Sequence, residues 1–256
     1  MNTSASDPAA PKKPTVPTWY LVCLILASFL IAYVSELVTA ENKERFFTAT
    51  GLPPFPPELL LKVMWDNIYN HSICFGFLGA VLCGTLTMIS GGLVGPARAI
   101  SGFLLGSAFG LVMGAAAGIT GYFISDSLTE QKIDSIIKAV IVFTPVWAII
   151  GSVASACSML ILGRLALIPK AIGMSIAMAL FAAITYPLIV TALFPNDWPG
   201  VIIPEFARTR LVCFAVGGLC VSLGIVFTLQ PAKEQRTKSA DTAGTDTVLE
   251  KNNASV

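Results

Sequence analysis

Hydrophobic residues in this chain are gathered into six long blocks, which short polar or mixed segments separate. Several blocks exceed the roughly 20 residues that an α-helix needs to cross the hydrocarbon of a bilayer. The pattern therefore predicts an all-α polytopic membrane protein, a bundle of six transmembrane helices within residues 18–229. The expected spans are about 19–40, 72–90, 99–124, 139–162, 171–194 and 211–229.

The first block, residues 19–40, has two interpretations. Lys12 and Lys13 precede it, and the small residues between Ser35 and Ala40 have the spacing of a signal-peptidase site. A cleaved signal would leave five spanning helices. We favour a retained helix, because the apolar run is long for the core of a signal peptide and the tail before it is long as well.

The segments outside the blocks divide into tails and helix starts. Residues 1–17 and 230–256 are rich in small and polar residues and predict disordered cytoplasmic tails. Residues 58–69 mix charged and aromatic side chains, which is typical of an interfacial lead into the second span.

Local signals predict where individual helices begin. A proline suits the first turn of a helix, so Pro57 and Pro204 predict the starts of the second and last helices. Ser127 and Glu130 have the spacing of a capping box, which predicts that the fourth helix begins near Leu128.

The distribution of basic residues predicts the orientation. The two tightest turns carry Arg98, Arg164 and Lys170 and no acidic residue, whereas the longer loops are mixed. Lysine and arginine in short loops favour the cytoplasmic side. We therefore expect an integral protein of the plasma (inner) membrane with both termini in the cytoplasm.

Glycine recurs every fourth residue in the third block. In lipid, helices associate through close packing, and small residues let their backbones approach. The row predicts a helix-packing surface, used either against the protein's own helices, which we favour, or for self-association of protomers or lining of a pore. Its members are Gly102, Gly106, Gly110, Gly114 and Gly118.

Ionisable residues inside a membrane are candidates for function because they are costly to insert. No Asp, Glu, Lys, Arg or His lies in the middle of an expected span; Glu36 lies near one end of the first span and His71 at the entrance of the second. Asp66, Asn67, Asn70 and His71 predict a polar outer rim. The alternative is a catalytic role for His71 as a general base.

Two prolines, Pro145 and Pro187, fall in or near expected spans, where each removes a backbone hydrogen bond and kinks a helix or lines a cavity. The six cysteines form no CxxC motif, so we expect buried small hydrophobic residues and neither a metal site nor a cofactor. A net charge of +1 indicates no nucleic-acid partner.

Composition agrees with the membrane class: 55% of residues are hydrophobic and only 12% are charged, whereas about a quarter of the residues in soluble domains are charged.

Three functions follow as hypotheses. The first is a non-enzymatic membrane protein acting through helix packing, as a subunit, assembly or organising factor, with the bilayer, further copies or other membrane subunits as partners. The second is a transporter or channel for a neutral or weakly polar solute. The third is a membrane enzyme centred on His71.

Overall fold

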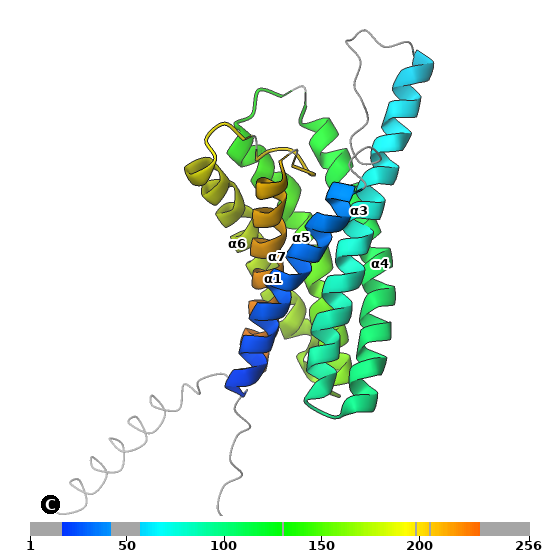
Figure 1. Cartoon of the computed structure of the whole chain (residues 1–256), viewed down its shortest axis with the longest axis vertical. Coiled ribbons are helices and arrows are strands. Elements are labelled where there is room, and N and C mark those ends of the chain that lie inside the picture. The colour runs from blue at the N-terminus through cyan, green and yellow to red at the C-terminus, as the bar shows by residue number, and fades with distance from the viewer. Residues whose placement is uncertain (1–16, 42–56, 130, 198, 205, 231–256) are drawn as a thin grey trace, which may run out of the picture. The chain divides into compact units, whose positions relative to one another are not determined.

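The computed structural model describes residues 17–41, 57–129, 131–197, 199–204 and 206–230, and in this part of the chain every regular element is a helix. Six of these helices are long and apolar enough to cross a membrane (Figure 1), which confirms the predicted all-α class. They are α1 (Thr18–Glu41), α3 (Pro57–Gly92), α4 (Pro96–Ser127), α5 (Ser135–Ile161), α6 (Ile168–Leu193), preceded by the 3-10 turn η1 (Leu165–Leu167), and α7 (Ala207–Leu229).

Successive helices run in opposite directions, so the bundle has two chemically different ends. The start of α1 meets the end of α3, where the hydroxyl of Tyr20 lies 2.8 Å from Ser90 Oγ. The end of α1 meets the start of α7 through Glu36 and Arg210. We call the first end, which holds the tight turns before α4 and α6, the turn end, and the opposite end the loop end.

The helices match the expected spans to within a residue or extend beyond them, and α7 begins at Ala207 rather than at the predicted Pro204. The longest helix, α3, has 36 residues, so at 1.5 Å per residue it measures about 54 Å and includes the expected interfacial lead of 58–69. Most of the two predicted tails, 1–16 and 231–256, lies outside the described residues.

The predicted capping box is wrong. Ser127 is the last residue of α4, and its hydroxyl donates to the carbonyl of Ile124 one turn back. The cap of α5 is instead Asp134, whose carboxylate accepts from the N–H of Ile136 at 2.8 Å. The spacing of Ser127 and Glu130 was therefore a coincidence of composition in a polar loop.

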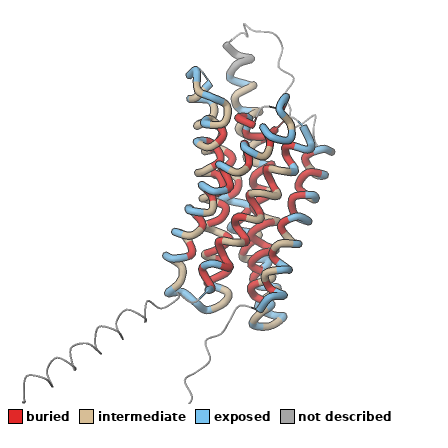
Figure 2. The backbone as a smooth tube through the Cα atoms, turned by 90° about the vertical axis from the view of Figure 1, so that its left-hand side faces the viewer, coloured by how far each residue is buried: buried red, intermediate tan, exposed pale blue. Residues whose placement is uncertain are grey.

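Burial divides the helices into inner and outer faces (Figure 2). Large side chains fill the interior, among them Trp147, Tyr186, Phe75 and Phe143. Large apolar side chains also cover the outside, as expected when the surrounding solvent is hydrocarbon rather than water. Two observations therefore support a multi-pass membrane protein: the length of the apolar helices and the apolar outer surface of the bundle.

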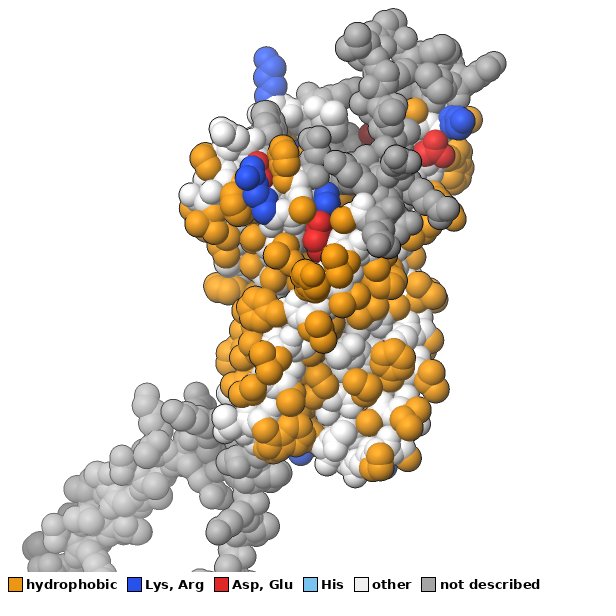
Figure 3. Space-filling model, in the orientation of Figure 1, with side chains coloured by type: hydrophobic (Ala, Val, Ile, Leu, Met, Phe, Trp, Pro, Cys, Tyr) orange, Lys and Arg blue, Asp and Glu red, His pale blue; other side chains and the backbone are white. Residues whose placement is uncertain are grey.

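Charge is divided between the two ends. Every Asp and Glu in the described part of the chain belongs to the loop end by its position on a helix or loop, whereas Arg98, Arg164 and Lys170 belong to the turn end. On the face seen in Figure 3, charged side chains gather at the upper, loop end above a band of apolar side chains. A cytoplasmic turn end stays a prediction that this separation favours.

Candidate functional site

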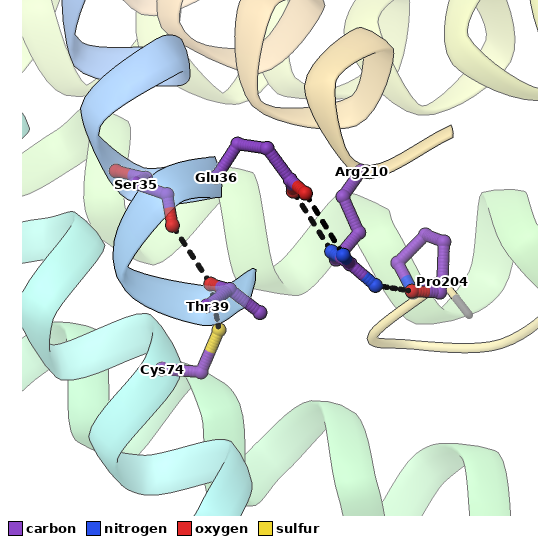
Figure 4. A network of polar contacts seen from close by, with 6 residues as sticks. All are labelled: Ser35, Glu36, Thr39, Cys74, Pro204 and Arg210. Atoms are coloured by element: carbon purple, nitrogen blue, oxygen red, sulfur yellow. Dashed lines mark hydrogen bonds and ion pairs between the residues drawn. The ribbon is translucent and has the colours of Figure 1, made fainter. Parts of the chain in front are cut away.

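The most unusual polar feature of the bundle is an ion pair between its first and last helices. Nε and Nη2 of Arg210 each donate to one oxygen of the Glu36 carboxylate at 2.8 Å, and Nη1 donates to the carbonyl of Pro204 at 2.9 Å (Figure 4). Glu36 is 8% and Arg210 2% exposed. The guanidinium therefore joins α1, α7 and the loop before α7 at a single point.

The local sequence explains why these two charges need each other. Glu36 lies near the C-terminal end of α1, and Arg210 lies in the first turn of α7. A carboxylate at a helix C-terminus and a cation at a helix N-terminus each oppose the helix macrodipole. Because the helices are antiparallel, the two unfavourable charges lie at the same level and neutralise each other.

A small polar shell of α1 and α3 lies beside this pair. The hydroxyl of Thr39 donates to the carbonyl of Ser35 at 2.8 Å and lies 4.0 Å from the thiol of Cys74 on α3. The hydroxyl of Ser35 is buried and has no partner among the described residues. Through Thr39 and Glu36, α1 thus contacts both α3 and α7 at this level.

This buried ion pair is not among the predictions from the sequence, which place Glu36 near one end of the first span and Arg210 between the expected spans 171–194 and 211–229. The two residues are 174 positions apart, so no local motif connects them. A usable signal is that the acid Glu36 and the base Arg210 border two different apolar blocks at the same predicted face of the membrane.

A second ion pair at the loop end has one exposed and one buried partner, since the side chain of Arg208 is 53% exposed and that of Asp197 is 2% exposed. Arg208 donates to both oxygens of Asp197 at 3.0 and 2.8 Å, and the hydroxyl of Thr209 donates to the same carboxylate at 2.6 Å. The guanidinium also lies over the rings of Phe194 and Phe206. The hydrogen bonds from Arg208, and next that from Thr209, hold the pKa of Asp197 below its ordinary value.

The predicted rim residues Asp66, Asn67, Asn70 and His71 share the loop-end part of α3, but only some of them meet. His71 Nδ1 lies 2.6 Å from the carbonyl of Asn67, and its ring packs on Tyr122 of α4 with 5.5 Å between the centroids. Asn70 is buried, and Asp66 and Asn67 are half-buried. No acidic side chain orients the imidazole through a described hydrogen bond.

The five glycines of α4 all face α3. A Cβ at Gly102 would lie 2.7 Å from the carbonyl oxygen of Thr87, and one at Gly106 would lie 2.5 Å from that of Cys83. The remaining three meet carbonyl oxygens in the same way, so that each step of four along α4 matches a step of four back along α3. The partners of Gly110, Gly114 and Gly118 are Gly79, Phe75 and His71.

Hydroxyl pairs connect other helices inside the bundle. Ser28 of α1 and Ser222 of α7 lie 2.7 Å apart, and Ser155 of α5 and Ser175 of α6 also lie 2.7 Å apart. Each hydroxyl of these two pairs is buried. The polar side chains of the interior are thus mostly used between neighbouring helices.

In the described part of the chain, no group of three or more His, Cys, Asp or Glu residues lies close enough together to bind a metal ion. Comparison of the chain with protein-family models, curated proteins and solved structures finds no match.

Proposed function

We propose that this multi-pass membrane protein is non-enzymatic and acts through helix packing, as a subunit or organising factor of a membrane assembly. The observation that carries the proposal is the α3–α4 contact, in which five glycines at a spacing of four bring two backbones together. Close backbone packing of this kind makes a rigid pair of helices. A rigid pair is suited to serve as a scaffold against which other subunits of an assembly pack.

The use of the interior polar groups supports the same function. Buried ion pairs and hydroxyl pairs join α1 to α7 and α5 to α6, so they stabilise contacts between helices. Outside, exposed positions such as Leu104 and Val112 of α4 present large apolar side chains. Such a surface packs equally well against acyl chains and against apolar helices of other subunits.

Photo-crosslinking in the native membrane tests this function. A photoreactive residue replaces one exposed position on each helix in turn. We expect neighbouring positions to form adducts with the same membrane protein or a second copy of this chain, and adducts with lipid alone from every helix would contradict the proposal. Loss of all complementation by His71→Ala, with the protein still inserted, would favour an enzyme instead. The positions are Leu26, Tyr69, Val112, Ile141, Phe181 and Phe227.

A specific observation also favours the second candidate, a transporter or channel for a neutral solute. Trp147 Nε1 and the hydroxyl of Tyr186 are buried and have no hydrogen-bond partner among the described residues. Each lies next to or near a proline, Pro145 in α5 and Pro187 in α6, and a proline leaves one carbonyl of its helix without an N–H partner. Unpaired donors and acceptors beside these prolines are what an uncharged polar solute requires.

Flux measurements separate the two candidates. Liposomes that contain the purified protein are tested for passage of glycerol and urea. The Trp147→Phe variant, which lacks the buried N–H donor, is tested in the same way. Flux that depends on the protein and falls in this variant would support transport. Flux no greater than that of empty liposomes would remove transport of these two solutes.

A further inference from the structure

The turn end of the bundle gathers three basic side chains from two different turns. Arg98 follows the turn after α3, whereas Arg164 and Lys170 flank η1 between α5 and α6. All three are exposed. No acidic residue from the described part of the chain belongs to this end, so no described carboxylate neutralises Arg98 or Arg164.

Arg98 connects the two turns. It lies in the first turn of α4, and its Nη1 donates to the carbonyl of Ile161, the last residue of α5, at 3.0 Å. The same nitrogen lies 3.9 Å from the position of a Cβ at Gly163, next to Arg164. A guanidinium has five N–H donors in a planar fork, so one bond to Ile161 leaves further N–H donors for a ligand.

Lys170 has a similar position on the neighbouring hairpin. It lies in the first turn of α6, and its Nζ donates to the carbonyl of Thr228 near the end of α7 at 3.0 Å. Both basic side chains thus start at the N-terminus of one helix and reach the carbonyl end of another, where a cation is favourable.

The helix N-termini at this end lack side-chain caps. Gly95 before α4 and Leu167 before α6 provide no side-chain hydrogen bond to the first free N–H groups. The positive end of a helix dipole and a basic residue in the first turn both attract an anion, and phosphate is the usual ligand of such an end. The basic side chains and the helix ends therefore favour the same ligand chemistry.

The surroundings distinguish a lipid from a free anion. Large apolar side chains, Val94, Ile100, Leu160 and Leu165, are exposed around the same turns. A free phosphate would gain nothing from these neighbours, whereas a phospholipid would place its phosphate against the basic groups and its acyl chains against the apolar side chains. Basic pockets between the ends of transmembrane helices bind anionic headgroups in this way.

We propose that Arg98 and Arg164 form a binding site for the phosphate of an anionic phospholipid at the turn end. The site does not depend on whether the protein acts in an assembly or in transport.

The test is a lipid competition. The full-length protein is placed in nanodiscs of mixed phosphatidylglycerol and phosphatidylcholine, and the lipids that remain bound after extraction are counted by native mass spectrometry. We expect phosphatidylglycerol to be enriched on the wild type and the enrichment to fall by about thirtyfold in Arg98→Gln/Arg164→Gln, since each basic residue near an anionic surface contributes about fivefold.

Matched variants keep the result interpretable. Lys62→Gln removes the same charge from an exposed position of α3 at the loop end, and it should leave the enrichment unchanged. Arg98→Lys/Arg164→Lys keeps the charge and should retain most of it. If the double glutamine variant folds poorly, Arg164→Gln alone is used instead. Arg164 makes no side-chain hydrogen bond within the described residues, so this substitution should not disturb folding. It should still lower the enrichment of phosphatidylglycerol about fivefold.

Two outcomes would overturn the proposal. Equal enrichment on the wild type and on the glutamine variants would show that these residues do not select the lipid. Thermal stabilisation of the detergent-solubilised protein by inorganic phosphate, to the same extent as by phosphatidylglycerol, would show that a free anion is the ligand and that the apolar neighbours play no part.

Discussion

The α3–α4 contact and the α1–α7 contact hold helices together in two different ways. Between α3 and α4 the backbones touch, because glycine leaves no side chain between them. Between α1 and α7 side chains form the connection, through the hydroxyls of Ser28 and Ser222 and the charges of Glu36 and Arg210. The first contact depends on shape, and the second depends on hydrogen bonds and charges in a low dielectric.

The difference matters for how each contact responds to change. A glycine contact fails when any atom is added, and it is indifferent to pH. A polar contact tolerates small changes of shape, but it fails when one partner is removed, because the other is left buried and unpaired. Substitutions can therefore separate the two contacts by the kind of change that breaks each one.

The largest expected effect is the loss of one member of the buried ion pair. Arg210→Ala or Glu36→Ala should lower the free energy of unfolding by about 3–5 kcal/mol, since each removes one ion of a buried, doubly hydrogen-bonded ion pair. SDS titration in mixed micelles measures this. In Glu36→Met/Arg210→Met most of the stability should return, because no charge is left unpaired. A double variant as unstable as the single variants would mean that the pair contributes through its specific geometry.

The next effect is the addition of one methyl group between α3 and α4. A Cβ at Gly110 would overlap the carbonyl of Gly79, so Gly110→Ala should cost about 1–3 kcal/mol of unfolding free energy. Gly173→Ala in α6 is the matched control, because a Cβ there meets nothing within 4 Å and should stabilise the helix by about 0.5–1 kcal/mol. Equal effects of the two substitutions would refute a tight α3–α4 contact.

A smaller effect is expected for the hydroxyl pair of α1 and α7. Ser222→Ala removes the partner of Ser28, which still donates to the carbonyl of Leu24. Interhelical hydrogen bonds in membranes contribute about 0.6 kcal/mol on average and about 1.7 kcal/mol at most, so the loss should fall in this range. Ser152→Ala, which removes a hydroxyl of α5 without a described side-chain hydrogen bond, should change the same unfolding free energy less.

The smallest effect concerns pH at the pair of Asp197 and Arg208, in which only the arginine is exposed. The pKa of Asp197 is lower in the folded protein than in the unfolded chain, because Arg208 stabilises the carboxylate. Its stabilisation is therefore complete above the unfolded pKa of about 3.9 and is lost as the pH falls through the folded value. Asp197→Asn should flatten the acid limb of a plot of melting temperature against pH. An unchanged acid limb would contradict the lowered pKa.

The two contacts also differ in how far the sequence predicts them. The glycine row and its spacing of four are local, so the chain itself identifies Gly102 to Gly118 as a packing surface. The opposing residues of α3 share that spacing but are not all glycine, and Thr87 or His71 gives no sign of a facing backbone. Long apolar blocks likewise predict the six spans and the class of the fold.

Polar connections between distant helices were beyond local signals. Pairing of Glu36 with Arg210 depends on which helices are neighbours, and neither composition nor periodicity specifies that. The cap of α5 shows the same limit on a smaller scale: Ser127 and Asp134 are both good caps, and only the length of α4 decides between them. Lys62, by contrast, is exposed and makes no described hydrogen bond, so its place on the surface does not depend on which helices are neighbours.

The central claim is that the glycine row of α4 packs against α3 of the same chain. A Cβ at Gly76 would lie 3.5 Å from the Cβ of Ala115, within the range that a disulfide bridges. The measurement is oxidation, in native membranes, of Gly76→Cys/Ala115→Cys in a background without the six native cysteines. We predict a disulfide within one chain and no covalent dimer; a dimer linked through these positions, or no disulfide at all, would contradict the account.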